Sequence, residues 1–217
     1  MALRVKICGL RRPEHVRAAV EGGAAYLGFV FFAASPRSVS AETAATLCAE
    51  APAGVARVGL FVDPDDAMLQ KTLDLCPLDM IQLHGAETPT RVAETRSRFR
   101  LPVMKALPIA GPEDVARIDA YEGVADQILC DAKPKPGAAV PGGAGEAFDW
   151  ALLAGRRWRK PWLLAGGLRP ETVADAAAIS GASQVDVSSG VEARRGEKDE
   201  GLIRAFLAAA AAAPAAA

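Results

Sequence analysis

The stretch LRVKICGLRRPEHVRAAVEGGAAYLGFVF, residues 3–31, contains the unit from which the fold can be predicted. Its first apolar run, 3–8, has the length of a buried strand, and 12–23 is typical of a helix that ends at glycine. A second strand-like run follows at 25–31. Because strands joined by a helical crossover run parallel, this stretch predicts a strand–helix–strand unit of a parallel sheet.

The same alternation continues along the chain. Ser40 is expected to cap the second helix, and Asp63 to cap the third helix with Pro64 in its first position. The further strand-like runs lie at 55–62, 79–85, 101–107, 126–131, 161–167 and 183–189, and the further helical segments at 40–51, 63–76, 88–99, 111–121, 148–155, 169–180 and 202–212.

Eight strand–helix pairs predict a single-domain α/β fold, the (β/α)₈ or TIM barrel. We place the barrel at 1–207 and an alanine-rich C-terminal tail at 208–217, whose first part extends the last helix before Pro214. The alternative is an open, doubly wound sheet. Such sheets usually carry a GxGxxG turn after the first strand, and CGLRRP at 8–13 does not match it.

The overall composition narrows the class of protein. The chain has 217 residues, of which 51% are hydrophobic, and its 25 basic and 26 acidic residues leave a net charge of −1. A sizeable core is therefore expected, with no preference for nucleic acid or a membrane surface. The first residues lack the apolar core of a secretion signal, and the scattered cysteines and histidines lack metal-ligand spacing. We expect a cytoplasmic enzyme with reduced thiols and no metal, and a monomer rather than a dimer, because no exposed apolar stripe is evident.

A thiol and a carboxylate are expected to face each other in the mouth of the barrel, where the carboxyl ends of the strands meet. Strand side chains alternate between faces, so Val5 and Ile7 pack against helices while Cys8 points inward. The same alternation turns Asp131 into the mouth and Cys130 under a helix. Cys8 and Asp131 thus form a candidate general acid/base pair. The alternatives are a buried packing cysteine and an aspartate that caps a loop.

Three more polar residues follow strand ends. Arg37 in the SPR motif offers a bidentate fork for a carboxylate or a phosphate, and its alternative is an ordinary surface arginine. Gln82 and His84 end the fourth strand. His84 is either a base or a polar group at the rim, and we count both residues as substrate-binding candidates.

Glycine-rich segments after the last strands predict a phosphate site. Two adjacent turns supply backbone N–H groups, and serine hydroxyls lie at the second turn, next to a helix N-terminus. The GGAG sequence at 142–145 either completes this cradle or acts as a lid, and the alternative for each glycine pair is a tight turn. The candidate residues are Gly142, Gly143, Gly166, Gly167, Asp186, Ser188, Ser189 and Gly190.

Eight short motifs together resemble one family. KICG, GFVF, SPR, VGLFV, QLHG, GGAGEAFDW, LAGGL and DVSSGVE occur in order up to residue 192. The set is similar to the phosphoribosylanthranilate isomerases of tryptophan biosynthesis. The resemblance implies a (β/α)₈ barrel without metal or organic cofactor. It also implies a small-molecule substrate, N-(5-phosphoribosyl)anthranilate, which undergoes an Amadori rearrangement.

The resemblance also implies a role for each matching residue. Cys8 corresponds to the family's general base, Asp131 to its general acid and Arg37 to its contact for the anthranilate carboxylate, and the glycine-rich segments correspond to its phosphate contacts. Two positions depart from the pattern, since Ala34 stands where a lysine is common and Ala144 where a threonine is common. The remaining alternatives are another sugar-phosphate barrel isomerase and a barrel that binds a phosphate ligand without turnover. Cys8 also needs either a lowered pKa or catalysis by a small thiolate fraction, because free cysteine has a pKa of about 8.5.

Overall fold

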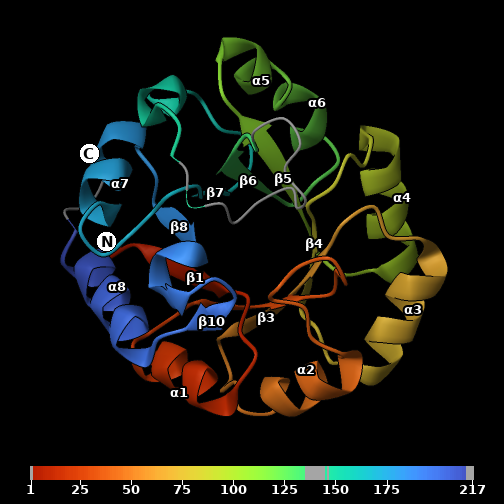
Figure 1. The fold of residues 1–217 in the computed structure, drawn as a ribbon. Coiled ribbons are helices and arrows are strands. Elements are labelled where there is room, and N and C mark those ends of the chain that lie inside the picture. Colours follow the sequence, from red (N-terminus) through yellow and green to blue (C-terminus); the bar gives the residue numbers. More distant parts are fainter. Residues whose placement is uncertain (1, 135–144, 146, 214–217) are drawn as a thin grey trace.

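The computed structural model describes residues 2–134, 145 and 147–213. Within these residues, eight parallel strands form a closed barrel in sequence order, and β8 pairs with β1 to complete it. Figure 1 looks into this barrel and shows the helices arranged around the strands. The predicted (β/α)₈ architecture is therefore confirmed, and the open sheet is excluded.

The described elements have the following bounds. The barrel strands are β1 Arg4–Cys8, β2 Tyr26–Val30, β3 Ala56–Phe61, β4 Met80–Leu83, β5 Val103–Ile109, β6 Gln127–Ala132, β7 Trp162–Leu164 and β8 Gln184–Val187. The helices are α1 Pro13–Glu21, α2 Ala41–Cys48, α3 Asp66–Leu75, α4 Pro89–Phe99, α5 Pro112–Ala116, α6 Asp119–Glu122, α7 Val173–Ser180 and α8 Glu200–Ala212. Two 3₁₀ helices, η1 Trp150–Leu153 and η2 Ser189–Val191, and a hairpin of β9 Glu192–Arg194 and β10 Glu197–Lys198 complete the set.

The alternation of side chains along the strands separates two apolar layers. Outward residues such as Val5 and Ile7 join the large core between strands and helices. Inward residues form a second layer inside the barrel, which includes Val58, Met104 and Leu129. Because inner and outer positions alternate along every strand, the inner position at each carboxyl end faces the barrel mouth.

The third helix begins later than expected. Asp65, not Asp63, is its N-cap and accepts a hydrogen bond from the backbone N–H of Met68. Asp63 has a φ of 45° and lies in the loop after β3, where its carboxylate accepts from the N–H of Ala86. The prediction of an Asp63 cap is therefore wrong, because this carboxylate joins two neighbouring loops instead of starting a helix.

Three other segments differ from the predicted pattern. The segment 148–155 contains only the short 3₁₀ helix η1, and 111–121 divides into α5 and the start of α6. The last barrel strand ends at Val187, and the chain then forms the β9–β10 hairpin before α8. Short charged strands of this kind carry no period-two apolar pattern, so the sequence did not reveal the hairpin.

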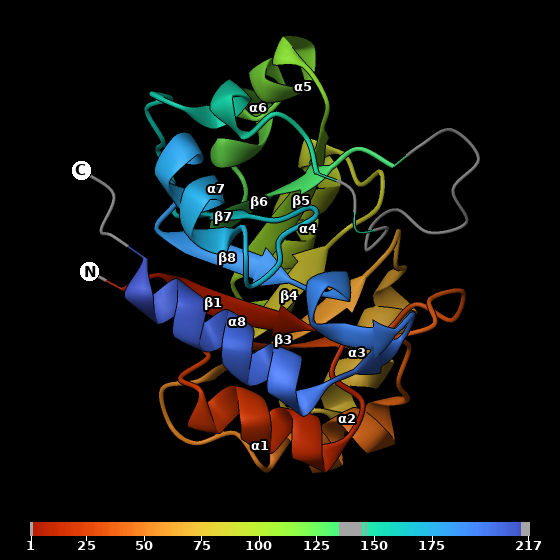
Figure 2. The same cartoon turned by 60° about the vertical axis from the view of Figure 1, so that its left-hand side comes forward.

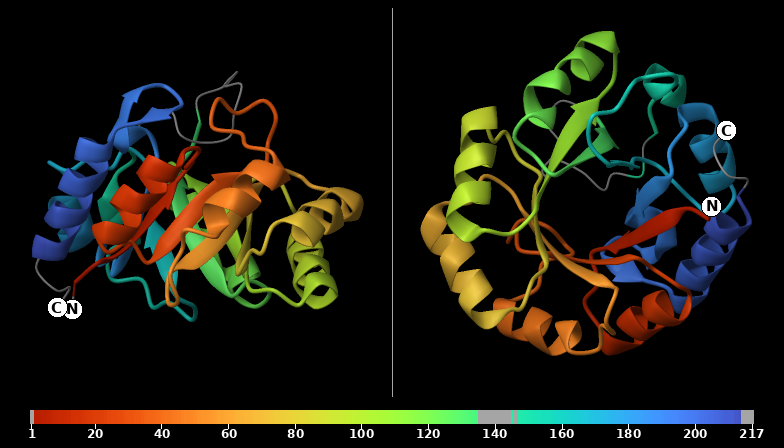
Figure 3. Two further views of the ribbon diagram at one scale, coloured as in Figure 1. Left: turned by 90° about the horizontal axis from the view of Figure 1, so that it is seen from below. Right: turned by 180° about the vertical axis from the view of Figure 1, so that it is seen from behind.

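Helix α8 runs from Glu200 to Ala212, so the boundary placed at residue 208 falls inside it. Ala210 is fully buried and belongs to the core, because α8 packs against α1 and α7. Figure 2 shows α8 lying along the side of the barrel beside β1. In the left view of Figure 3 the start of β1 and the end of α8 lie on one side of the barrel, and the β9–β10 hairpin (blue) lies on the other, at the mouth. No helix within the described ranges is both long and apolar enough to span a membrane.

Candidate active site

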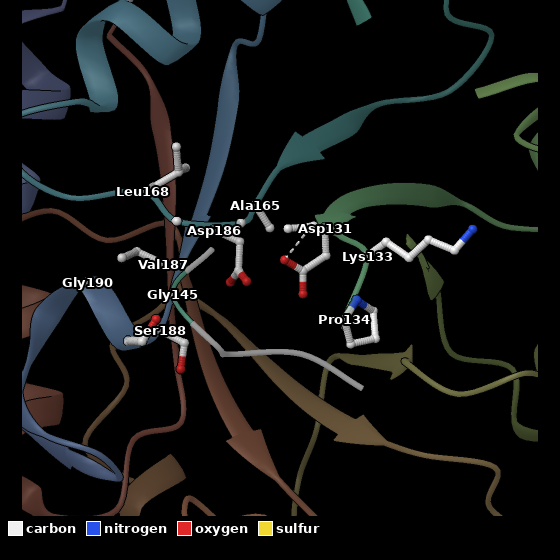
Figure 4. A pocket seen from close by; sticks show the side chains of 14 residues that line it. Asp131, Lys133, Pro134, Gly145, Ala165, Leu168, Asp186, Val187, Ser188 and Gly190 are labelled. Atoms are coloured by element: carbon white, nitrogen blue, oxygen red, sulfur yellow. Dashed lines mark hydrogen bonds between the residues drawn. The ribbon is translucent and has the colours of Figure 1, made fainter. Parts of the chain in front are cut away.

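A pocket opens at the carboxyl ends of β6, β7 and β8. Its walls come from residues 131–134, 165–168 and 186–190, together with Gly145. Figure 4 shows the carboxylates of Asp131 and Asp186 pointing into the same space, with Ser188 beside it. The structure therefore brings most of the predicted acid and phosphate residues together at one mouth.

Cys8 lies at the carboxyl end of β1, on the inner face next to Lys6. Its side chain packs with Val30 and Leu60, and the residue is 4% exposed. Gly28 of β2 is paired with Cys8, and a Cβ added to Gly28 would lie 3.2 Å from the sulfur and 3.0 Å from Lys6 Nζ. The absence of a side chain at Gly28 thus allows Lys6 and Cys8 to lie side by side.

The charges around Cys8 act in opposite directions. Burial raises the pKa of the Cys8 thiol, while the nearby Lys6 and Lys198 ammonium groups oppose that rise. Lys6 Nζ lies 2.8 Å from Asp186 Oδ1, and although burial disfavours its charge, Asp186 and Cys8 together outweigh burial and raise the pKa of Lys6. Lys6 therefore stays an ammonium group beside the sulfur. The net result is a raised pKa for the Cys8 thiol, not the lowered pKa that was one of the two options.

Asp131 belongs to a short chain of polar contacts across β4 and β6. Gln82 Nε2 lies 2.9 Å from His84 Nδ1, and an amide nitrogen only donates, so Nδ1 accepts and the ring proton lies on Nε2. His84 Nε2 in turn lies 3.3 Å from Asp131 Oδ2, and Asp131 Oδ1 accepts from the N–H of Ala132 at 2.8 Å. Gln82 is fully buried behind His84. These contacts fix the orientation of the Asp131 carboxyl group.

The glycine-rich turns after β7 and β8 have the geometry of a backbone cradle. Gly166 and Gly167 have φ values of 87° and 67°, and a Cβ on Gly166 would lie 2.7 Å from the backbone N of Ala132. A Cβ on Gly190 would collide with the carbonyl oxygen of Leu168. Gly166 and Gly190 are therefore restricted to glycine, because a side chain would collide with the end of β6 at Gly166 and with the turn after β7 at Gly190.

The predicted phosphate set also includes two serines and the GGAG sequence. Ser188 and Ser189 line the pocket at the start of η2, and Gly145 lies beside Ser189. Gly142 and Gly143 lie outside the described residues. Among the described residues, no group of three histidine, cysteine, aspartate or glutamate side chains is arranged to hold a metal ion.

Arg37 lies in the loop after β2, and it is not an ordinary surface arginine because it is only 4% exposed. Its Nε and Nη2 donate to the two oxygens of Glu192 at 2.6 Å and 2.9 Å. Lys198 Nζ also donates to Glu192, at 2.7 Å. Sequence reasoning did not single out Glu192 or Lys198. Glu192 is the last residue of the DVSSGVE motif, and its place in that motif was the signal that could have revealed it. Lys198 left no such signal, because the hairpin that carries it has no periodic pattern.

Known proteins match this chain over nearly its full length. A family model described as N-(5'phosphoribosyl)anthranilate (PRA) isomerase matches residues 5–209. The N-(5'-phosphoribosyl)anthranilate isomerase of Paracoccus denitrificans is 58% identical over 212 residues, which cover 98% of this chain and 99% of that protein.

Solved structures match as well. The crystal structure of phosphoribosyl anthranilate isomerase from Thermotoga maritima has a TM-score of 0.85 and 37% identity, covering 96% of this chain and 98% of that one. A second structure, with a TM-score of 0.82 and 35% identity over the same shares, shows phosphoribosyl anthranilate isomerase in complex with reduced 1-(o-carboxyphenylamino)-1-deoxyribulose 5-phosphate. The chain therefore belongs to the N-(5'-phosphoribosyl)anthranilate isomerase family.

Proposed function

We propose that this chain converts N-(5'-phosphoribosyl)anthranilate into 1-(2-carboxyphenylamino)-1-deoxyribulose 5-phosphate, with Cys8 as general base and Asp131 as general acid. The observation that carries the assignment of roles is the placement of the two groups. The thiol ends β1 and the carboxyl ends β6, both on the inner face of the mouth, and the glycine turns flank the carboxyl group. The family to which the chain belongs supports the reaction itself.

Asp131 opens the ribose ring by giving a proton to the ring oxygen, which leaves a Schiff base at C1′. The resulting carboxylate accepts a hydrogen bond from the backbone N–H of Ala132 and lies 3.3 Å from His84 Nε2. Gln82 acts on the substrate only through His84, because it holds the ring tautomer that places a proton on Nε2. These donors stabilise the charge that forms as the proton leaves.

Cys8 performs the second proton transfer. The Schiff base acidifies the proton on C2′, and the Cys8 thiolate removes it to give an enolamine that tautomerises to the ketone. Burial favours the neutral thiol in the free enzyme, and the Lys6 ammonium group stabilises the thiolate when it forms. The chemistry consists of proton transfers between side chains and substrate, so we propose that it needs no metal or organic cofactor.

The two ends of the substrate are bound at different sites of the mouth. The phosphate binds the backbone N–H groups of the turns at 166–167 and 188–190, and the anthranilate carboxylate binds Arg37. Asp186, paired with Lys6 at 2.8 Å, faces the ribose between them. Fixing both ends converts ring opening and proton abstraction into reactions of a bound, oriented substrate.

A fluorescence assay with freshly prepared substrate tests these roles, because anthranilate-type fluorescence falls as the product forms. Cys8→Ala and Asp131→Asn should each reduce kcat by roughly 10²–10⁴-fold while the circular dichroism spectrum is retained. Cys130→Ala is the matched control, because this thiol is buried on the outer face of β6. Near wild-type turnover in Cys8→Ala or Asp131→Asn would reject the role of that residue.

We also propose that the protein is a cytoplasmic monomer. Among the described residues, the exposed large apolar side chains are Met68 and Leu75 on or at the ends of α3 and Ile179 on α7. These helices lie on opposite sides of the barrel, so the three side chains form no common patch (Figure 1). Light scattering at micromolar concentration should give the mass of one chain, and a mass of two chains would reject the monomer.

A further inference from the structure

The β9–β10 hairpin packs on the loop that carries Arg37. Arg11 Nη1 donates to the carbonyl oxygens of Pro36 and Gly196, at 2.9 Å and 3.2 Å, and so joins the loop to the hairpin turn. Gly196 has a φ of 84°, and a Cβ there would lie 2.9 Å from the oxygen of Pro36. The hairpin and the SPR loop therefore form one packed unit at the mouth.

Glu192 lies at the centre of a buried charge cluster inside this unit. Its two carboxylate oxygens accept from Arg37 Nε and Nη2, from Lys198 Nζ at 2.7 Å and from the backbone N–H of Gly196 at 3.0 Å. The exposed fractions of the Arg37, Glu192 and Lys198 side chains are 5%, 4% and 1%. Burial alone would raise the pKa of Glu192, but Arg37 and Lys198 outweigh it and lower this pKa to about 2. The cluster of two cations and one anion therefore carries a formal charge of +1.

The same cluster is bonded to the segments that hold the base and the expected phosphate site. Lys198 Nζ donates to the carbonyl oxygen and the hydroxyl of Ser188, at 2.9 Å and 3.2 Å. The Ser188 hydroxyl donates to the carbonyl oxygen of Cys8 at 3.1 Å. A shift of Glu192 would thus be felt by both Arg37 and the ends of β8 and β1.

Two buried cations side by side repel each other unless an anion lies between them. Burial lowers the pKa of Lys198, and its neighbour Arg37 lowers it further, while Glu192 opposes both effects. A planar guanidinium group held along one edge by a carboxylate has a fixed plane and a fixed direction. An anchor whose orientation is fixed before binding loses less entropy when the ligand arrives.

We propose that Glu192 is the positioning residue for carboxylate recognition: by bridging Arg37 and Lys198 it fixes the plane of the Arg37 guanidinium toward the anthranilate carboxylate of the substrate. This inference rests on the proposed function and on the role of Arg37 within it. It assigns a task to the β9–β10 hairpin, which orients an anchor on a loop that lies 155 residues earlier in the sequence.

A pair of ligands that differ only in the carboxylate tests the proposal. The probes are reduced 1-(2-carboxyphenylamino)-1-deoxyribulose 5-phosphate and the same compound with an unsubstituted phenyl ring, each titrated into the protein by calorimetry. In the wild type the carboxylated ligand should bind more tightly by roughly tenfold or more, the contribution of a hydrogen-bonded charge pair. Glu192→Gln should bring this ratio close to one, and any effect on the phosphate site through Lys198 cancels in the ratio because both ligands carry the phosphate.

Two controls separate positioning from other effects. Arg37→Gln should bring the ratio close to one, as Glu192→Gln does, because both variants remove the same oriented contact. Glu197→Gln should keep the wild-type ratio, because this hairpin carboxylate pairs at the surface with Arg12 and Arg194.

The double variant Glu192→Gln/Lys198→Met keeps the cluster's net charge of +1 but lacks the carboxylate that bridges Arg37 and Lys198. It also replaces the single variant in this test if Glu192→Gln alone does not fold. A ratio near one in the double variant supports positioning, whereas a wild-type ratio there shows that net charge alone suffices and overturns the proposal. Equal weakening of both ligands in Glu192→Gln, or tighter binding of the carboxylated ligand, also overturns it. If the wild-type protein turns over substrate but binds both ligands equally well, Arg37 is not the contact for the carboxylate, and the inference about Glu192 is wrong. If the wild-type protein shows no turnover, the proposed function itself is wrong.

Discussion

Gly28→Ala should disturb Cys8, the proposed general base, without touching the proposed contacts to either end of the substrate. The new Cβ would lie 3.0 Å from Cys8 Cα, 3.0 Å from Lys6 Nζ and 3.2 Å from the Cys8 sulfur. Ordinary carbon contacts begin near 3.4 Å, so these groups must move by several tenths of an ångström. Because Cys8 Cα is one of the crowded atoms and β1 is held by β2 and β8 on either side, the backbone at Cys8 and the side chains of Lys6 and Cys8 must share the shift.

The size of the effect follows from this displacement. A misplacement of 1 Å in a reacting group costs roughly 10²-fold in rate, so a shift of about half that size should lower kcat roughly tenfold. The KM should stay near its wild-type value, because the phosphate turns and Arg37 are untouched. The overpacked site should also lose about 1–3 kcal/mol of unfolding free energy.

Steady-state fluorescence kinetics and urea unfolding measure the two effects separately. Gly123→Ala is the matched control, because its added Cβ would meet no atom within 4 Å. A Gly28→Ala variant with wild-type kcat and reduced stability would refute the reasoning, since it would show that the position of the sulfur does not limit the reaction. A raised KM with unchanged kcat would refute it as well.

Two further predictions concern buried charge and the thiol. Lys105→Met should lower the free energy of unfolding in urea by about 3–5 kcal/mol. The substitution removes the ammonium group whose Nζ lies 2.7 Å from Glu87 Oε2, and so leaves a buried carboxylate unpaired. A loss below ~1 kcal/mol would show that the buried Glu87 carboxylate does not depend on this partner. The rate at which iodoacetamide labels Cys8, followed by mass spectrometry, should rise roughly tenfold per pH unit between pH 7 and 8.5. Only the thiolate reacts, and burial raises the pKa of this thiol, so its thiolate fraction keeps increasing over this range. A labelling rate that levels off below about pH 8 would show that the neighbouring cations win over burial.

The predictable part of this structure depends on local periodicity. The barrel followed from alternating apolar runs, and the inward direction of Cys8 and Asp131 followed from the period of two along β1 and β6. The Asp63 cap failed because three aspartates lie within four residues, and the choice between them depends on a tertiary contact to Ala86.

The unpredicted part depends on contacts between distant segments. Arg37 and Glu192 pair across 155 residues, and Gln82 reaches Asp131 only through His84. Neither contact leaves a periodic signal, because each requires the barrel to close first. The β9–β10 hairpin was missed for a related reason, since strands of three and two residues are shorter than any pattern that alternation can reveal.

The closure of β8 onto β1 also has a topological consequence. Helix α8 returns the chain to α1, and the left view of Figure 3 shows the start of β1 and the end of α8 on the side away from the mouth. In a closed ring of eight strands, the order of neighbouring strands does not depend on where the polypeptide is cut. A circularly permuted chain, with a linker that joins the end of α8 to the start of β1 and new ends in a loop on the amino-terminal side, would rebuild the same ring and leave the mouth of the barrel unchanged.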